Sequence, residues 1–167
     1  MKRVDQKLIK DNAIDEFKNK FALVCARKKD GTFNMCTIAW GSIGELWSKD
    51  VLTVYVKPIR YTDEFINEDE YFTVTFFNEE DRKILSVCGS KSGRDIDKVK
   101  ECNLSIIDLK DGITFEGFRR VYLCRKIYQG QFKKDEFVNS NDIIERYYKD
   151  EPYHNFYIGE IIEVYEQ

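Results

Sequence analysis

The chain has 167 residues, of which 43% are hydrophobic and 34% charged, and this mixture fits one compact domain better than a repeat array, a collagen or a disordered tail. Its 27 basic and 30 acidic side chains give a formal net charge of −3, which argues against a nucleic-acid binder, because such proteins carry a basic excess. There are 12 Phe, 10 Tyr and 2 Trp but a single histidine, His154, so a zinc site built from several histidines is excluded.

The predicted elements begin with a helical lead-in over residues 1–20. Residues 21–26 (FALVCA) then form a buried strand. Asp30 and Gly31 predict a hairpin turn into a second strand over residues 32–40, because both turn positions tolerate a positive φ.

Two further strands are predicted over residues 51–56 and 71–77, where β-branched and aromatic residues follow one another. Short helices are expected between the strands. Thr62 can cap the first of these helices, and Asn78 can cap a second that ends at Gly89.

The second half of the chain continues this pattern. It predicts a helix near residues 95–102, strands near 104–109, 114–118 and 121–132, a turn at Asp111-Gly112, a helix capped by Asn141, and a closing strand over 156–164. Seven or eight strands joined by hairpins and short helices favour a mostly β (α+β) fold, an antiparallel barrel with peripheral helices, over a doubly wound sheet.

The five cysteines are widely separated and form no Cys-x-x-Cys pair, so neither a redox dithiol nor a thiolate metal site is expected. We interpret them as reduced, small apolar residues of a cytoplasmic protein. No apolar run reaches the roughly 18 residues of a membrane helix, and the N-terminus has no signal-peptide core.

One candidate site is a hydroxyl-rich and basic segment before the helix predicted near residue 95. Two hydroxyls, two cations and free main-chain N–H groups make it a candidate phosphate site, with Ser92 as a possible helix cap. An ordinary solvated connector would have the same composition, and the pattern is not that of a P-loop. The candidate residues are Ser90, Lys91, Ser92, Gly93, Arg94 and Asp95.

A second candidate directly follows the strand at 51–56 and is also rich in cations. It comprises Lys57, Arg60, Tyr61 and Thr62. Two turns that favour anions and lie about thirty residues apart can bind one ligand, although two independent surface turns remain an alternative.

The third candidate is the strand that carries Trp40. Its polar residues interrupt an apolar run, and a flat heteroaromatic ligand needs such a wall. Packing of Trp40 in the core is the alternative interpretation. The candidate residues are Asn34, Met35, Cys36, Thr37, Ile38, Ala39 and Trp40.

Four sequence motifs occur in order along the chain: Asn-x-x-Thr-Ile-x-Trp-Gly from Asn34, Val-Tyr-Val-x-Pro-x-Arg-Tyr-Thr from Val54, Phe-Thr-Val-x-Phe from Phe72, and Gly-x-Lys-Ser-Gly-Arg-Asp-x-Asp-Lys from Gly89. Together with the closing Tyr-Ile-Gly-Glu-Ile, they resemble the flavin reductase-like, FMN-binding split-barrel family, which includes the flavoredoxins. The resemblance runs from about Phe21 to Val164.

The resemblance implies a single FMN-binding domain over residues 1–167, an antiparallel split β-barrel of about six strands. It also implies a homodimer that holds FMN near the subunit interface. By position, Asn34, Thr37, Ile38 and Trp40 would line the flavin ring, and Arg60, Thr62, Lys91, Ser92 and Arg94 would be the phosphate candidates.

His154 stands just before the closing strand. Related short-chain flavin reductases carry an Asp-His pair at a similar place, and here Tyr153 stands where the Asp would be. The resemblance implies a catalytic position for His154, and a solvated loop histidine is the alternative.

The expected function is an FMN-dependent oxidoreductase, a flavin reductase or flavoredoxin-like protein. It would move electrons from NAD(P)H or a protein donor to a small-molecule or protein acceptor. An FMN-binding electron carrier or sensor without NAD(P)H turnover is one alternative, and a flavin oxidase of the pyridoxamine-phosphate-oxidase type is another. No Rossmann Gly-x-Gly-x-x-Gly is present, so no dedicated nicotinamide domain is expected.

Overall fold

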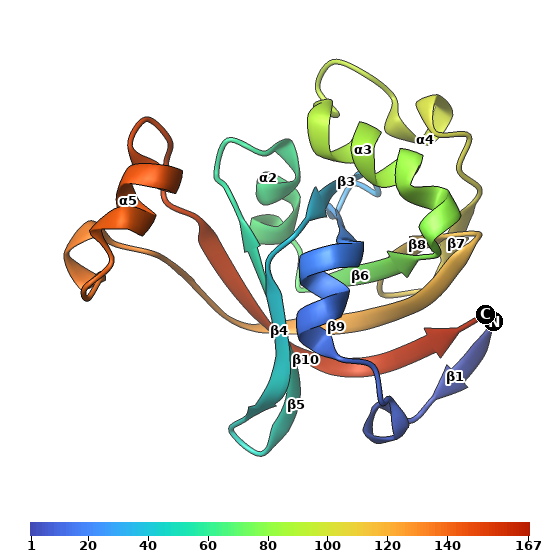
Figure 1. The fold of residues 1–167 in the computed structure, drawn as a ribbon. Coiled ribbons are helices and arrows are strands. Elements are labelled where there is room, and N and C mark those ends of the chain that lie inside the picture. The colour runs from blue at the N-terminus through green and yellow to red at the C-terminus, as the bar shows by residue number, and fades with distance from the viewer.

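The computed structural model describes residues 1–167, apart from the side chain of Glu79. Antiparallel strands make up most of the molecule, and short helices surround them (Figure 1). The strands are β1 (Lys2–Val4), β2 (Ala22–Arg27), β3 (Phe33–Ile38), β4 (Gly41–Leu46), β5 (Lys49–Val56), β6 (Tyr71–Phe77), β7 (Ile106–Asp108), β8 (Ile113–Phe115), β9 (Phe118–Gln131) and β10 (Asn155–Glu166).

The helical segments are all short. They are η1 (Gln6–Leu8), α1 (Ala13–Asp15), the π-helix η2 (Glu16–Lys20), α2 (Tyr61–Glu68), η3 (Glu79–Asp81), α3 (Arg82–Ser90), α4 (Lys98–Glu101), η4 (Lys134–Glu136) and α5 (Asn141–Tyr148). Among the described residues, no helix has both the length and the apolar character needed to cross a bilayer.

The main sheet has eight strands in the order β3-β2-β6-β9-β10-β5-β4, with β1 beside β10, and all its pairs are antiparallel. The two edge strands β3 and β4 follow each other in the chain and are joined only by Ala39 and Trp40. They do not pair in the described sheet, so the barrel stays open between them. This confirms the predicted antiparallel split barrel with short peripheral helices.

The core forms two clusters on the two faces of the sheet. The first cluster joins β5, β6 and β10 to Phe65 and Ile66 of α2, and the second joins the sheet to α3 and β8. Alternate residues of a strand point to opposite faces. Cys36 and Ile38 of β3 therefore belong to the first cluster, whereas Met35 belongs to the second.

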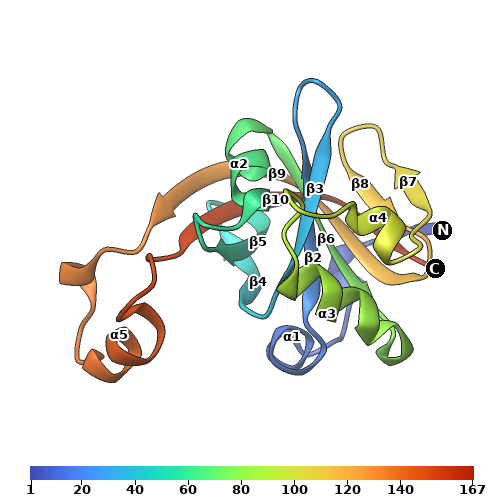
Figure 2. The ribbon, with the colours of Figure 1, turned by 90° about the horizontal axis from the view of Figure 1, so that it is seen from above.

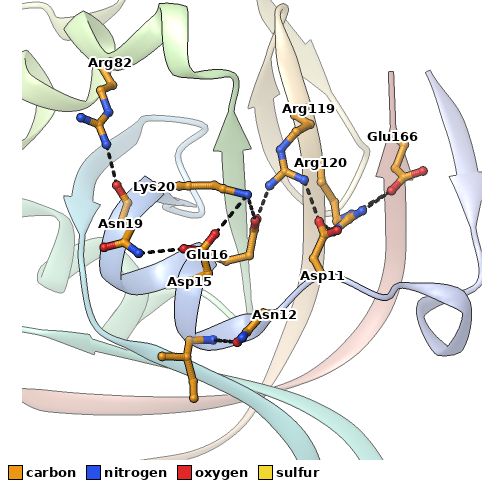
Figure 3. Close-up of polar contacts among 11 residues, drawn as sticks. Asp11, Asn12, Asp15, Glu16, Asn19, Lys20, Arg82, Arg119, Arg120 and Glu166 are labelled. Carbon is orange, nitrogen blue, oxygen red and sulfur yellow. Dashed lines mark hydrogen bonds and ion pairs between the residues drawn. The ribbon is translucent and has the colours of Figure 1, made fainter.

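An ionic network fixes the N-terminal segment to the barrel (Figure 3). Arg119 Nη1 lies 2.8 Å from Asp11 Oδ2, and Lys20 Nζ lies 2.7 Å from Glu16 Oε1. Arg119 also contacts Glu16, while the buried Arg120 contacts Asp11 and Glu166. Through Arg119 the network holds η2 against β9, and Arg120 links Asp11 to Glu166 at the end of β10.

Phe17 of η2 closes the barrel next to the gap between the edge strands. Its ring packs edge-on against Phe76 at 5.4 Å between centroids. A Cβ at Gly41 would lie only 2.3 Å from this ring, so the close approach requires glycine at the start of β4.

β9 and β10 are the longest strands. The C-terminal end of β9 and the N-terminal end of β10 extend beyond the barrel (Figures 1 and 2). The chain between them carries η4 and α5, which lie at the opposite end of the molecule from the two termini. We call residues 132–154 the arm.

Several helix caps differ from the sequence prediction. The N-cap of α2 is Arg60 and not Thr62, because the Thr62 hydroxyl accepts a hydrogen bond from Asn34. The turn η3 intervenes after Asn78, so the N-cap of α3 is Asp81, and Gly89 lies inside the helix.

The predicted caps of the later helices are also displaced. Ser92 accepts a hydrogen bond from the N–H of Arg94 in a local turn. The cap of α4 is Asp97, whose carboxylate accepts from two main-chain N–H groups. Asn141 is the first residue of α5, and its N-cap is Ser140.

Candidate functional site

Two of the three predicted segments meet at a groove between the start of α2 and the loop after α3. We call it the cationic groove, and its volume is about 210 Å³. Its lining carries four cations and one carboxylate. The lining residues are Cys36, Lys57, Ile59, Arg60, Tyr61, Thr62, Ser90, Lys91, Ser92, Gly93, Lys98 and Glu151.

The end of β3 forms the wall of a second groove, which we call the aromatic groove. Its volume is about 300 Å³. The lining residues are Cys36, Thr37, Ile38, Ala39, Trp40, Tyr55, Val56, Lys57, Arg60 and His154.

The two grooves adjoin, because Cys36, Lys57 and Arg60 line both. One end of the combined site is therefore positively charged, and the other presents aromatic and aliphatic side chains. Small-molecule sites commonly have roughly 300–1,000 Å³ and a few convergent polar groups on an apolar wall, as here.

Two hydrogen bonds between distant segments shape the cationic groove. Nη1 of Arg60 donates to the main-chain oxygen of Gly89 at 2.7 Å, which ties the start of α2 to α3. Nδ2 of Asn34 donates to Thr62 Oγ1 at 3.0 Å, and both side chains are buried. Gly93 closes over this pair, because a Cβ there would lie 2.3 Å from Asn34 Oδ1.

Lys98 is a buried cation at the cationic groove. Its Nζ donates to the main-chain oxygens of Met35, at 2.7 Å, and Cys88, at 3.1 Å. Burial lowers the pKa of this ammonium group. No carboxylate among the described residues pairs with it, so its charge is not neutralised within the groove.

Thr37 connects the aromatic groove to α3. Its hydroxyl donates to the main-chain oxygen of Leu85 at 2.6 Å, so it can only accept a further hydrogen bond. The neighbouring Cys36 thiol is buried, and burial raises its pKa. Cys36 is therefore a neutral wall residue and not a thiolate nucleophile.

His154 is buried beside Trp40, with 4.7 Å between ring centroids. Its Nδ1 lies 3.0 Å from the Tyr148 hydroxyl. Burial, with smaller contributions from the positive charges of Lys57 and Arg60, lowers the pKa of His154 to about 4. The imidazole is therefore neutral at pH 7, and the alternative of a solvated loop histidine is wrong.

The arm contacts the site at two further points. The Tyr147 ring packs edge-on against Trp40 at 5.2 Å, and Glu151 Oε2 lies 3.3 Å from Lys57 Nζ. Trp40 keeps 37% of its surface exposed, so it forms an open wall and is not a core residue.

A buried carboxylate aligns the start of α2 with β10. Asp63 accepts hydrogen bonds from the Tyr157 hydroxyl at 2.7 Å and from Asn155 Nδ2 at 3.0 Å. Since Asp63 follows Thr62 and Asn155 follows His154, this contact holds the two grooves in fixed relation.

Most of the candidate residues line the two grooves, but four do not. Asn34 donates a hydrogen bond to Thr62 without lining either groove, and Met35 points to the other face of β3. The Arg94 guanidinium pairs with Glu64 and stacks at 4.4 Å over the Tyr61 ring. These three residues and Asp95 line a separate groove of about 680 Å³ beside the β2–β3 turn.

Sequence reasoning missed Lys98, Tyr55, Tyr148 and Glu151 as parts of the site. Lys98 ends the fourth motif, which was the one available signal for it. Tyr148 and Glu151 reach the site only because the arm folds back, and nothing in the local sequence indicates this.

Residues 14–167 match the family model described as flavin reductase like domain. No curated protein matches the sequence.

Several solved structures have a similar fold. Flavoredoxin from Methanosarcina acetivorans is 25% identical with a TM-score of 0.68, over 89% of this chain and 68% of that one. Flavoredoxin of Desulfovibrio vulgaris (Miyazaki F) is 20% identical with a TM-score of 0.68, over 88% and 69%. The FMN-binding protein from Thermus thermophilus with bound p-hydroxybenzaldehyde is 19% identical with a TM-score of 0.68, over 88% and 71%.

Proposed function

Because this chain belongs to the flavin reductase like domain family, we propose that it binds FMN across the cationic and aromatic grooves and acts as a flavin reductase or flavoredoxin-like oxidoreductase. The observation that carries the proposal is the junction of the grooves at Cys36, Lys57 and Arg60. FMN has a phosphate at one end and a flat ring at the other, and the joined grooves have the matching chemistry.

The cationic groove suits a phosphate. Lys57 is paired with Glu151, but Lys91 and the buried Lys98 have no carboxylate partner among the described side chains. A buried cation is costly without an anion, and a phosphate supplies one. Arg60 and the hydroxyl of Ser92 add donors.

The aromatic groove suits the ring. Trp40 and Tyr55 offer aromatic surfaces, Ile38 and Ala39 aliphatic ones, and His154 a polar ring nitrogen. We propose that these residues hold the isoalloxazine system and exclude water from one side of it.

Bound FMN supplies the electron-transfer chemistry, so the protein needs no acid or base at the reacting atoms. The chain's own residues orient the cofactor, and the uncharged His154 and Cys36 add no charge to the ring end. We propose NAD(P)H or a reduced protein as the electron donor, and a small molecule or a protein as the acceptor.

A homodimer is part of the proposal, and an uncovered aromatic surface supports it. Trp47 and Tyr128 are 59% and 50% exposed, and their rings lie 6.1 Å apart. Tyr128 also stacks on Phe156 at 6.0 Å. Exposed aromatic residues of this kind are enriched at protein interfaces. Sedimentation of the wild type and of Tyr128→Glu tests this, since a dimer through this face is expected to dissociate in the variant.

The five free cysteines support a reducing compartment, and we propose the cytoplasm.

The main test is a visible spectrum of the purified protein, followed by anaerobic titration with NADH and NADPH. We expect a bound flavin whose absorbance is bleached by one of the two nucleotides. A protein that fails to bind added FMN contradicts the proposal. A flavin that neither nucleotide bleaches favours an electron carrier or sensor.

A pair of variants tests the phosphate end. Lys91→Ala is expected to weaken FMN binding about tenfold and to leave riboflavin binding within about twofold, because only FMN carries the phosphate. Arg94→Ala is the matched control, since Arg94 is engaged by Glu64 outside the cationic groove. Equal losses for FMN and riboflavin in Lys91→Ala remove this residue from the phosphate site.

A further inference from the structure

Within the arm, the side chain of Tyr148 contacts His154, which lines the aromatic groove. The Tyr148 hydroxyl, at the end of α5, lies 3.0 Å from Nδ1 of His154, and both side chains are buried. The Tyr148 ring stacks on Tyr153 at 4.7 Å and meets Phe137 edge-on at 5.8 Å. These contacts fix the position of the hydroxyl.

The chemistry of the two groups indicates which of them donates. A phenol O–H is a stronger donor than the N–H of a neutral imidazole, and a bare imidazole nitrogen is a stronger acceptor than a phenol oxygen. Burial raises the pKa of Tyr148, so its proton is retained throughout the neutral range. The hydroxyl therefore donates to Nδ1, and the histidine proton is left on Nε2.

The second ring nitrogen has access to the groove. No described group makes a hydrogen bond to Nε2, yet no buried side-chain nitrogen or oxygen among the described residues lacks a partner. Nε2 therefore retains contact with solvent, and His154 lines the aromatic groove beside Trp40.

The charged groups around the imidazole favour its neutral form. Lys57 and Arg60 act on it from the segment between β5 and α2, and both oppose a second positive charge. Glu151 of the arm acts in the other direction, but it is paired with Lys57. Tyr148 and Tyr153 are the titratable neighbours within the arm, and burial raises the pKa of Tyr148, which keeps this phenol neutral at pH 7.

We propose that Tyr148 is a positioning residue, which donates its hydroxyl hydrogen to Nδ1 of His154 and so presents the histidine to the aromatic groove as a fixed, neutral Nε2–H donor. The ligand group that this donor meets is a carbonyl oxygen of a flat heteroaromatic ring. That second part rests on the proposed function, whereas the tautomer does not.

The single histidine of the chain makes the tautomer directly measurable. Protein labelled with ¹⁵N only in histidine gives one pair of imidazole nitrogen signals. At pH 7, without added flavin, we expect one protonated and one bare nitrogen, with the proton on Nε2. A proton on Nδ1 overturns the proposal.

Tyr148→Phe keeps the aromatic ring and removes the hydroxyl. We expect the pure tautomer of the wild type to become a mixture, with about half or more of the population changed. Tyr153→Phe is the matched control. Tyr153 stacks on the Tyr148 ring, but its hydroxyl has no described contact with His154. If Tyr148 has a purely structural role, the tautomer is unchanged in both variants, and that result overturns the proposal.

Addition of FMN separates this inference from the proposed function. We expect the Nε2–H signal of the wild type to shift on binding, and Tyr148→Phe to bind FMN about fivefold more weakly, the value of about one hydrogen bond. If the tautomer and its loss in Tyr148→Phe are observed but FMN does not bind, the positioning role stands and the proposed function fails. If FMN binds while the tautomer is unaffected by Tyr148→Phe, the proposed function stands and this inference fails.

Discussion

The ammonium group of Lys98 lies 2.7 Å from the main-chain oxygen of Met35 and joins α4 to β3. The two residues are 63 positions apart in the sequence. A second hydrogen bond, to the main-chain oxygen of Cys88, adds α3 to the same contact. One buried cation thus holds together three of the elements around the cationic groove.

Lys98→Met is expected to raise the dissociation constant of FMN about tenfold and to leave that of riboflavin within about twofold. The reason is that the substitution removes a buried positive charge close to the phosphate end. Calorimetric titration with both ligands measures the effect. Lys100→Met is the control, because Lys100 lies on the same helix but is exposed and paired with Asp97. Equal weakening of both ligands by Lys98→Met contradicts the prediction.

Gly93→Ala is expected to destabilise the fold by about 1–3 kcal/mol, because the added Cβ would lie 2.3 Å from Asn34 Oδ1. The displaced loop carries Lys91 and Ser92, so FMN binding is also expected to weaken. Urea unfolding measures the first effect. Gly44→Ala is the control, since a Cβ there meets nothing within 4 Å. The same unfolding midpoint in both variants contradicts the assigned packing.

The lowered pKa of His154 is expected to make the free energy of unfolding decrease in acid. Its pKa is about 4 in the folded chain, against 6.5 for an unperturbed histidine, so the unfolded chain binds the proton first as the pH falls. This group therefore leaves the free energy of unfolding unchanged above about pH 6.5 and lowers it by about 3 kcal/mol as the pH falls from about 6.5 to about 4.

Unfolding by urea at about pH 7 and about pH 4.5 tests this pH dependence. The carboxylates of the chain titrate in both proteins, so both are expected to lose stability between the two pH values. His154→Gln is expected to lose less than the wild type, because it has no imidazole to take up a proton on unfolding. An equal loss in the two proteins shows that His154 does not carry the effect.

Ser48→Gly is expected to stabilise the fold by about 1 kcal/mol. Ser48 and Trp47 both have φ 57°, a left-handed conformation that costs a residue with a Cβ about that much. The N–H of residue 48, which donates to Glu45 at 2.6 Å, is kept in the variant. Ser42→Gly, on strand β4 of the same hairpin, is expected to destabilise, and thermal unfolding of both variants compares them.

The hairpin at Trp47 and Ser48 also explains why β4 was not predicted. Two-residue hairpins with positive φ at both central positions usually carry Asn-Gly or Asp-Gly, and sequence reasoning searches for these pairs. Here the turn is imposed by the pairing of β4 with β5, and its residues carry no turn signal. By contrast, the Asp30-Gly31 turn between β2 and β3 was predicted and is confirmed.

The candidate site shows the same division between local and distant information. The runs around Trp40, Arg60 and Lys91 are each contiguous, so a sequence can indicate them, and the fold brings them to adjoining grooves. The cap at Thr62 was wrong because its hydroxyl bonds to Asn34, which is distant in the sequence, and the cap at Ser92 was wrong because its hydroxyl bonds within a local turn before α4. Contacts such as that of Lys98 with Met35 depend on the assembled sheet and leave no local pattern.

The position of Trp40 gives the protein an optical reporter of its own. Trp40 lies in the aromatic groove, and the other tryptophan, Trp47, lies in the distant β4–β5 turn. In a Trp47→Phe variant, the tryptophan fluorescence therefore comes from the groove alone. Emission from an indole overlaps the absorption of a yellow ring system, so occupancy of the groove is expected to quench it. A single emission titration would then follow ligand entry without a label.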